Sequence, residues 1–239
     1  MKNLAVMLIV AAMFVACGDD SGTSSSNVIP NEISYGTLKD SRDNQTYKTV
    51  TIGSQTWMAE NLNYNYNEGS AKSYCYDDKT SNCDKYGRLY LWSAAMDSAA
   101  VFSTAGKGCG YGKTCASTGS ATLVRGVCPE GWHLPNDDEL NALFIAVGGA
   151  SIAGTKLKSS SGWNSSGNGT DSFGFAVLPA GYRGHYGYFF DEGDDAHFWS
   201  SAEIDGVNAY RWTFIYYYEL VNIFGNLKYD GFSVRCVKD

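Results

Sequence analysis

Seven cysteines constrain the fold of this 239-residue chain more than any other feature. The first, Cys17, stands apart, directly after a short apolar run near the N-terminus. An even number of cysteines in the remainder of an exported chain is typical of a disulfide framework. We therefore expect a crosslinked domain rather than one held by its core alone. The six residues concerned are Cys75, Cys83, Cys109, Cys115, Cys128 and Cys236.

Spacing favours one pairing of these cysteines, although six cysteines allow many others. Two pairs lie close in sequence beside residues typical of turns, so each is expected to close a local loop. Cys128 and Cys236 then close a loop of about 110 residues, which contributes roughly 4–5 kcal/mol on the chain-entropy model. A zinc site is the alternative, but no C-x-x-C or H-x-x-x-H spacing is present. The expected disulfides are Cys75–Cys83, Cys109–Cys115 and Cys128–Cys236.

The N-terminal segment is typical of a lipoprotein export signal. Lys2 precedes the apolar run Leu4–Ala16, which is shorter than the roughly 20 residues of a membrane-spanning helix. Cys17 follows a small residue, as a lipobox requires, and its lipidation would anchor the mature chain by more than one acyl chain. An ordinary signal peptide with a chance cysteine is the alternative. Because Gly18 rather than aspartate follows Cys17, we expect the outer membrane of a Gram-negative cell, with the domain at the cell surface.

This segment also sets the expected domain boundaries. We predict a signal peptide at residues 1–16, a lipidated flexible tether at 17–34 and a folded domain at 35–239. The tether is rich in Ser, Gly, Asp and Asn and has little to bury.

Charge and composition exclude one class of partner. The chain has 25 acidic and 18 basic residues and no run rich in lysine or arginine, so nucleic-acid binding through a basic patch is not expected. Its 27 glycines and 17 tyrosines favour a loop-rich domain that contains β-strands.

Local patterns predict a hairpin and a helix in the first half of the domain. Tyr47–Ile52 alternates, a Gly-Ser pair suits a turn, and Gln55–Met58 resumes the apolar pattern. After a short strand candidate at Leu89–Trp92, the segment Ser93–Ala100 has helical composition.

The clearest helix start follows Pro135. Asn136 is a good N-cap, and Glu139 three residues later completes a capping box. A Gly-Gly pair at 148–149 is expected to end the helix. Its expected buried stripe is Leu140, Leu143, Phe144 and Val147.

Strands dominate the rest of the chain. After a loop at residues 159–171, Phe173–Leu178 is a candidate buried strand. Alternating apolar residues at 210–218 and at 232–236 predict two more strands. Because two helices come early, strands come late and no βαβ alternation occurs, the expected fold class is α+β.

Four segments follow one another in the order of a known family. They are Val50–Leu62, Tyr86–Tyr90, Cys128–Pro135 and Ser233–Val237. This order resembles the Fibrobacter succinogenes major paralogous domain, which is found in exported and often lipid-anchored bacterial proteins. More distantly, the last two segments are similar to segments of formylglycine-generating enzymes, whose fold is a variant of the C-type-lectin-like fold.

The resemblance implies a C-type-lectin-like fold with two helices, short antiparallel sheets and long loops. For the nearer family it implies no established activity, and the usual interpretation is a surface protein for adhesion or polysaccharide contact. Formylglycine-type oxidation would need a closely spaced pair of reactive cysteines near the C-terminus, where Cys236 stands alone. G-x-S-x-G, Walker A and G-x-G-x-x-G motifs are also absent, so no enzymatic activity is expected. An enzyme on the formylglycine-type fold and a purely structural envelope protein are the alternatives.

The three histidines give no recognisable metal-ligand spacing. His133 lies in the turn before Pro135 and is expected to be structural. His185 and His197 flank the acidic stretch Asp191–Asp195, which a solvated loop explains. The Glu-Pro-Asn and Gln-Pro-Asp triplets of calcium-dependent lectins are absent, so calcium has no support and no metal or cofactor is expected.

The segment Tyr182–Asp195, which is aromatic, glycine-rich and acidic, is the candidate ligand site. Aromatic rings stack on the flat CH faces of sugars while carboxylates accept hydroxyl hydrogens, and an ordinary ordered loop of the fold is the alternative. We expect this segment to project with the irregular loops and to bind polysaccharide or another surface component. The candidate ligand-binding residues are Tyr182, His185, Tyr186, Tyr188, Phe190 and Asp191.

Overall fold

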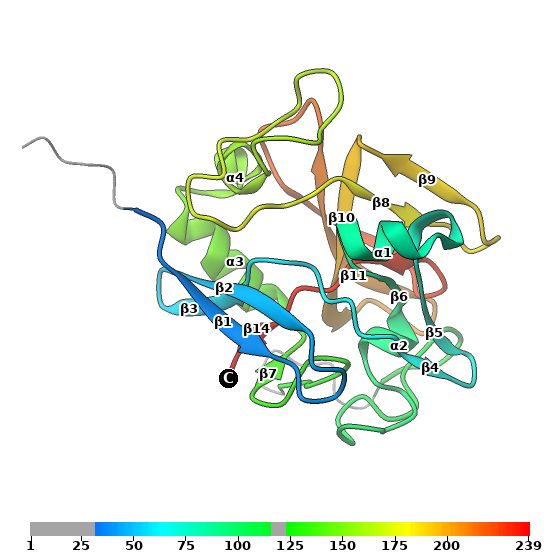
Figure 1. Ribbon diagram of the computed structural model, residues 1–239. Coiled ribbons are helices and arrows are strands. Elements are labelled where there is room, and N and C mark those ends of the chain that lie inside the picture. Colours follow the sequence, from blue (N-terminus) through cyan, green and yellow to red (C-terminus); the bar gives the residue numbers. More distant parts are fainter. Residues whose placement is uncertain (1–31, 116–122) are drawn as a thin grey trace, which may run out of the picture. The chain divides into compact units, whose positions relative to one another are not determined.

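The computed structural model describes residues 32–115 and 123–239 (Figure 1). Ile33–Asp239 pack as one unit. The predicted signal peptide at 1–16, the lipidation site Cys17 and all but the end of the predicted tether lie outside the described residues.

Two sheets, antiparallel apart from one strand pair, carry most of the regular structure. The five-stranded sheet has the spatial order β1 (Tyr35–Lys39), β2 (Thr46–Ile52), β3 (Gln55–Met58), β14 (Val237–Lys238) and β7 (Trp132–His133). The nine-stranded sheet has the order β12 (Asn222–Leu227), β11 (Asn208–Ile215), β10 (Asp195–Glu203), β8 (Ala180–Arg183), β13 (Gly231–Phe232), β6 (Leu89–Leu91), β5 (Ala71–Tyr74) and β4 (Asn67–Glu68), with β9 (Phe189–Glu192) paired to β8.

The class α+β is confirmed, but the expected number of helices is wrong. The described residues contain four α-helices and one short 3-10 helix, because α1 and α4 carry no strong sequence signal. These helices are α1 (Thr80–Tyr86), α2 (Trp92–Ala95), α3 (Asp137–Ala146), α4 (Ala150–Leu157) and η1 (Tyr76–Asp78).

Helix α3 begins as predicted. The side chain of Asn136 accepts a hydrogen bond from the backbone N–H of Glu139 at 3.0 Å, and the Glu139 carboxylate accepts from the backbone N–H of Asn136 at 2.9 Å. The predicted stripe is buried, so the helix is held by packing as well as by its cap. No single helix within the described ranges is long and apolar enough to cross a membrane, and α3 with α4 passes only as a pair bent by 76°.

The helix predicted at Ser93–Ala100 is wrong beyond its first turn. Asp97 and Ala100 both adopt positive φ, 58° and 57°, which a right-handed helix does not allow. The buried Asp97 carboxylate instead accepts hydrogen bonds from the backbone N–H groups of Val101, Phe102 and Ser103. This local bonding competes with the helix and ends it.

The strand predicted at Phe173–Leu178 is also wrong, although Phe175 and Val177 are buried as expected. Gly174 and Ala176 have φ values of 68° and 51°, so the segment turns instead of extending. The carbonyls of Phe175 and Ala176 accept hydrogen bonds from Arg235 rather than from a neighbouring strand.

All three predicted disulfides are confirmed. Cys75–Cys83 links η1 to α1 and Cys109–Cys115 closes a local loop. Cys128–Cys236, with both residues fully buried, joins the segment before β7 to the segment before β14. Figure 1 shows the end of the chain beside these strands, next to the first strands of the domain.

His133 is buried and contacts two carboxylates, which fits the structural role expected for it. Its Nε2 lies 2.6 Å from the Glu139 carboxylate and its Nδ1 lies 2.7 Å from the Asp239 carboxylate. Burial opposes the charged imidazolium, but the two carboxylates outweigh it and raise the pKa of His133. The residue thus connects the start of α3 to the end of β14.

Candidate functional site

The candidate segment Tyr182–Asp195 is a β-hairpin, not the irregular loop that we expected. Strands β8 and β9 pair in antiparallel register, with Tyr182 opposite Phe190. Their rings stack with centroids 5.4 Å apart. Glycine and acidic residues interrupt the alternation of apolar residues in this segment, so the sequence does not predict the hairpin. Only the five residues between the strands form a connecting loop.

A cavity of about 460 Å³ opens beside this hairpin. This volume is typical of a small-molecule or sugar site. Five of the six predicted ligand-binding residues line it: Tyr182, His185, Tyr186, Phe190 and Asp191. Tyr188 does not, because it lies on a separate surface beside Asp77–Lys79.

The opposite wall of the cavity comes from residues that were not among the candidate ligand-binding residues, although Asp195 ends the candidate segment. They are Asp195, His197, Arg211, Asn226, Leu227, Asp230 and Phe232. Most belong to β10, β11 and β12. Polar residues that alternate with buried aromatic ones along a strand are read as a solvent-exposed face. In this fold that face turns toward the hairpin, which only the tertiary structure reveals.

A chain of polar contacts runs along this wall. Arg211 donates from Nε to Oδ1 of Asn226 at 3.1 Å, and the Asn226 amide donates to Oδ2 of Asp230. Oδ1 of Asp230 is buried and has no hydrogen-bond partner within the described residues, although Nδ1 of His185 lies 3.5 Å away. Burial raises the pKa of Asp230. The wall therefore contains a buried carboxylate oxygen whose contact to His185 is long.

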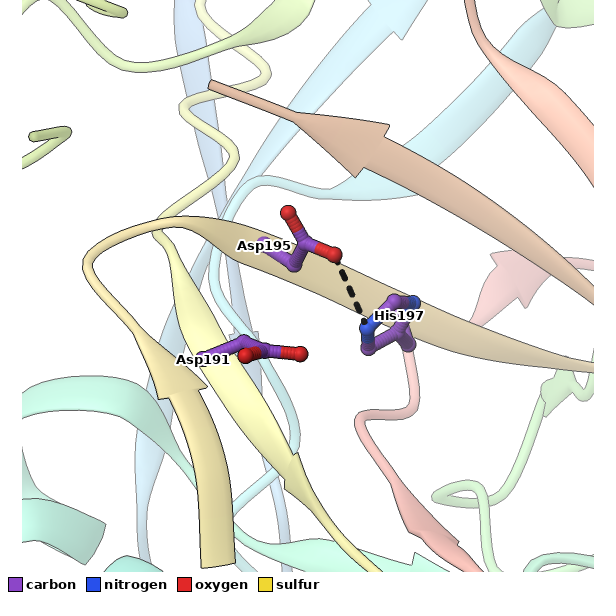
Figure 2. A group of neighbouring side chains, drawn as sticks. All are labelled: Asp191, Asp195 and His197. Carbon is purple, nitrogen blue, oxygen red and sulfur yellow. Dashed lines mark ion pairs between the residues drawn. The ribbon is translucent and has the colours of Figure 1, made fainter. Parts of the chain in front are cut away.

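Two carboxylates and an imidazole meet at one corner of the cavity. Figure 2 shows Asp195 and His197 projecting from β10 and Asp191 from the end of β9, with their polar atoms facing one another. One ligand atom from each lies within 4.8 Å of the others. Nε2 of His197 is 3.7 Å from Oδ2 of Asp195, which is beyond hydrogen-bond distance, and it has no hydrogen-bond partner among the residues described.

Burial and neighbouring charges shift the pKa values of all three side chains at this corner. Burial, together with the neighbouring charge of Asp191, raises the pKa of Asp195 to about 6. Burial and the charge of Asp194 raise the pKa of Asp191. Burial and the nearby Arg211 guanidinium lower the pKa of His197 well below its ordinary value, so its imidazole is neutral near pH 7.

The expectation that the acidic stretch is an exposed, solvated loop is therefore wrong at its end. The side chain of Asp195 is 18% exposed and that of His197 only 4%. Both belong to β10, whose pairing with β11 holds them in place. This corner supplies one nitrogen and two carboxylate donors that a cation could bind.

A second cavity, of about 310 Å³, lies beside Glu60, Tyr86 and Arg235. It is a weaker candidate, because the guanidinium of Arg235 already donates to Asn61, Phe175 and Ala176. These contacts serve the core rather than a ligand.

Comparison with known proteins gives one match. The family model of the Fibrobacter succinogenes major domain matches residues 50–238. This range contains all four of the segments on which the resemblance depends. No curated protein and no solved structure matches the chain.

Proposed function

This chain belongs to the Fibrobacter succinogenes major domain family, a paralogous family of uncertain function, and we propose that it is a lipid-anchored cell-surface protein whose domain binds polysaccharide without catalysis. The proposed binding site is the cavity between the β8–β9 hairpin and strands β10–β12. We further propose that the fold is a variant of the C-type-lectin-like fold. The placement of the first and last strands, β1 and β14, in one sheet supports this assignment.

The observation that carries the binding proposal is that aromatic rings line one side of the cavity and polar side chains line the other. Tyr182 stacks on Phe190, and Tyr186 at the rim is 81% exposed. Such rings offer flat apolar faces to the CH groups of a sugar. Across the cavity, Oδ1 of Asp230 makes a long contact of 3.5 Å to Nδ1 of His185 and is an acceptor for a sugar hydroxyl. A buried acceptor whose contact is long is incompletely satisfied, so a hydrogen bond from a ligand hydroxyl there is favourable.

A non-catalytic role is supported by the state of the cysteines. Formylglycine-type oxidation needs reactive thiols, whereas Cys236 is buried in a disulfide with Cys128. Every cysteine in residues 32–115 and 123–239 is disulfide-bonded.

We expect Tyr186→Ala to weaken binding to insoluble polysaccharide by roughly fivefold to tenfold, because a well-placed ring contributes about 1 kcal/mol. Tyr188→Ala is the matched control. This second tyrosine is 70% exposed on the same hairpin but does not line the cavity, so its removal should leave binding unchanged. The measurement is depletion of the full chain by cellulose and by other cell-wall glycans, with circular dichroism to verify folding.

Two outcomes would contradict the proposal. Failure of the wild-type protein to bind any of the glycans would contradict the proposed binding of polysaccharide. Equal binding by wild type and Tyr186→Ala would show that this cavity is not the site.

The proposed anchoring rests on the apolar run Leu4–Ala16 and on Cys17 directly after it. The three disulfides support an extracytoplasmic location, since such bonds persist in oxidising compartments. We expect Cys17→Ala to abolish incorporation of labelled palmitate and to leave the precursor unprocessed. The check is metabolic labelling followed by gel analysis, and label in the variant equal to wild type would contradict a lipoprotein.

A further inference from the structure

The corner formed by Asp191, Asp195 and His197 has a feature that an acidic surface cluster lacks. His197 lines the cavity and is almost completely buried, yet its Nε2 atom has no hydrogen-bond partner among the described residues. Buried polar atoms of folded proteins are nearly always paired, so an unpaired one that faces a cavity points to a missing ligand. The two carboxylates converge on the same space (Figure 2).

We propose that Asp191, Asp195 and His197 bind one divalent transition-metal ion, with Zn²⁺ as the representative, at this corner of the cavity. Calcium and magnesium prefer oxygen ligands alone, whereas one imidazole and two carboxylates suit zinc and its neighbours in the series. The inference does not depend on polysaccharide binding, because the three ligands are supplied entirely by the protein.

Binding requires a modest contraction of the corner. Ligand atoms on one tetrahedral zinc ion lie roughly 3–3.5 Å apart, given bond lengths of about 2.0–2.2 Å. The present atoms lie within 4.8 Å of one another. Asp191 is exposed at the end of β9, so its side chain has room to close the gap. Remaining coordination positions would face the cavity and take water or a ligand hydroxyl.

Arg211 competes with metal binding, because it donates a hydrogen bond to the proposed ligand His197. Its Nη1 atom donates to Nδ1 of His197 at 2.7 Å, which places the imidazole proton on Nε2. A metal-bound neutral imidazole instead needs the proton on Nδ1, where Oγ1 of Thr213 at 3.1 Å is an available acceptor. Metal binding therefore requires Nη1 of Arg211 to withdraw from His197, while its Nε can keep its bond to Asn226.

The test is calorimetric titration of the full chain with Zn²⁺ in the absence of any glycan. We expect Asp195→Asn to weaken zinc binding at this site by at least about tenfold, because it removes a ligand that carries charge. We expect Arg211→Gln to strengthen zinc binding by about tenfold, because changes in residues that contact the ligands typically alter metal affinity by that factor or more. Zinc bound elsewhere on the chain would contribute equally in every variant and would not alter these differences.

Asp194→Asn is the matched control. Asp194 carries the same charge one residue from Asp195, but its carboxylate accepts from the Asn164 amide and is not part of the corner. Its replacement should leave zinc affinity within about twofold of wild type. An equal loss in both asparagine variants would overturn the proposal in favour of diffuse attraction by the acidic turn.

His197→Gln supplies a second variant in case the Asp195 variant misfolds. It removes the nitrogen donor and should cost zinc affinity to a similar extent, with circular dichroism verifying the fold. Wild-type protein without a zinc site, or full affinity in a folded ligand variant, would overturn the proposal. Loss of glycan binding with zinc binding intact would instead contradict only the proposed function.

Discussion

Replacing both Cys128 and Cys236 by alanine is expected to lower the free energy of unfolding by about 4–5 kcal/mol. The bond spans 108 residues, so its loss releases a long loop in the unfolded chain and increases the entropy of that state. This loss is a large share of the 5–15 kcal/mol that is typical of a whole domain. Equilibrium unfolding in urea, followed by tryptophan fluorescence, measures the change.

The double variant of Cys75 and Cys83 is the matched control. This disulfide spans only 8 residues, so the same argument gives about half the loss, ~2.5 kcal/mol. Equal destabilisation of the two double variants would contradict the dependence on loop length. Retention of wild-type stability without Cys128 and Cys236 would contradict the role given to the long-range bond.

Arg235→Met is expected to cost about 3 kcal/mol of stability. Arg235 is buried to 1% exposure and donates from Nε to Oδ1 of Asn61 at 2.8 Å. Its other nitrogens donate to the carbonyls of Phe175 and Ala176. Methionine fills much of the same volume but leaves these acceptors unpaired in the core. Urea unfolding of wild type and variant gives the difference.

Arg183→Met provides the comparison for Arg235. Arg183 is half-buried on β8 and stacks over Tyr74, with its guanidinium carbon 3.9 Å from the ring centroid. We expect its replacement to lower the free energy of unfolding by less than about 1 kcal/mol, because water can reach the groups that lose contact with the partly exposed guanidinium. A similar cost at both positions would mean that hydrogen bonding by Arg235 is not the source of its effect.

Arg235 also explains why two of the family segments belong together. Asn61 lies in Val50–Leu62 and Arg235 in Ser233–Val237, and their side chains bond directly across 174 residues of sequence. The sequence shows both segments, but not this contact. A hydrogen bond between residues so far apart has no local signature.

Features with a local cause were predictable from the sequence. The β2–β3 hairpin and the capping box of α3 depend on neighbouring residues, and both are as expected. The helix beyond α2 was overpredicted, because alanine-rich composition does not reveal that Asp97 will bond to the following backbone.

The candidate site was predictable only on one side. The hairpin residues are neighbours in sequence, so their aromatic and acidic composition alone indicates a candidate site. Arg211, Asn226 and Asp230 arrive from strands and a turn that follow later, and their polar side chains resemble an ordinary exposed face. Whether such a face meets solvent or a cavity depends on sheet order, which alternation does not encode.

The position of β14 has a consequence for how the chain acquires its structure. This strand enters the five-stranded sheet between β3 and β7, so an interior position of the sheet is filled by the strand that is synthesised after the other four. A chain that emerges N-terminus first therefore holds two facing strand edges open until residues 237–238 arrive. Such sequence-distant pairing slows folding, and open edges invite pairing with other chains. A chain cut short before β14 would keep both edges unpaired.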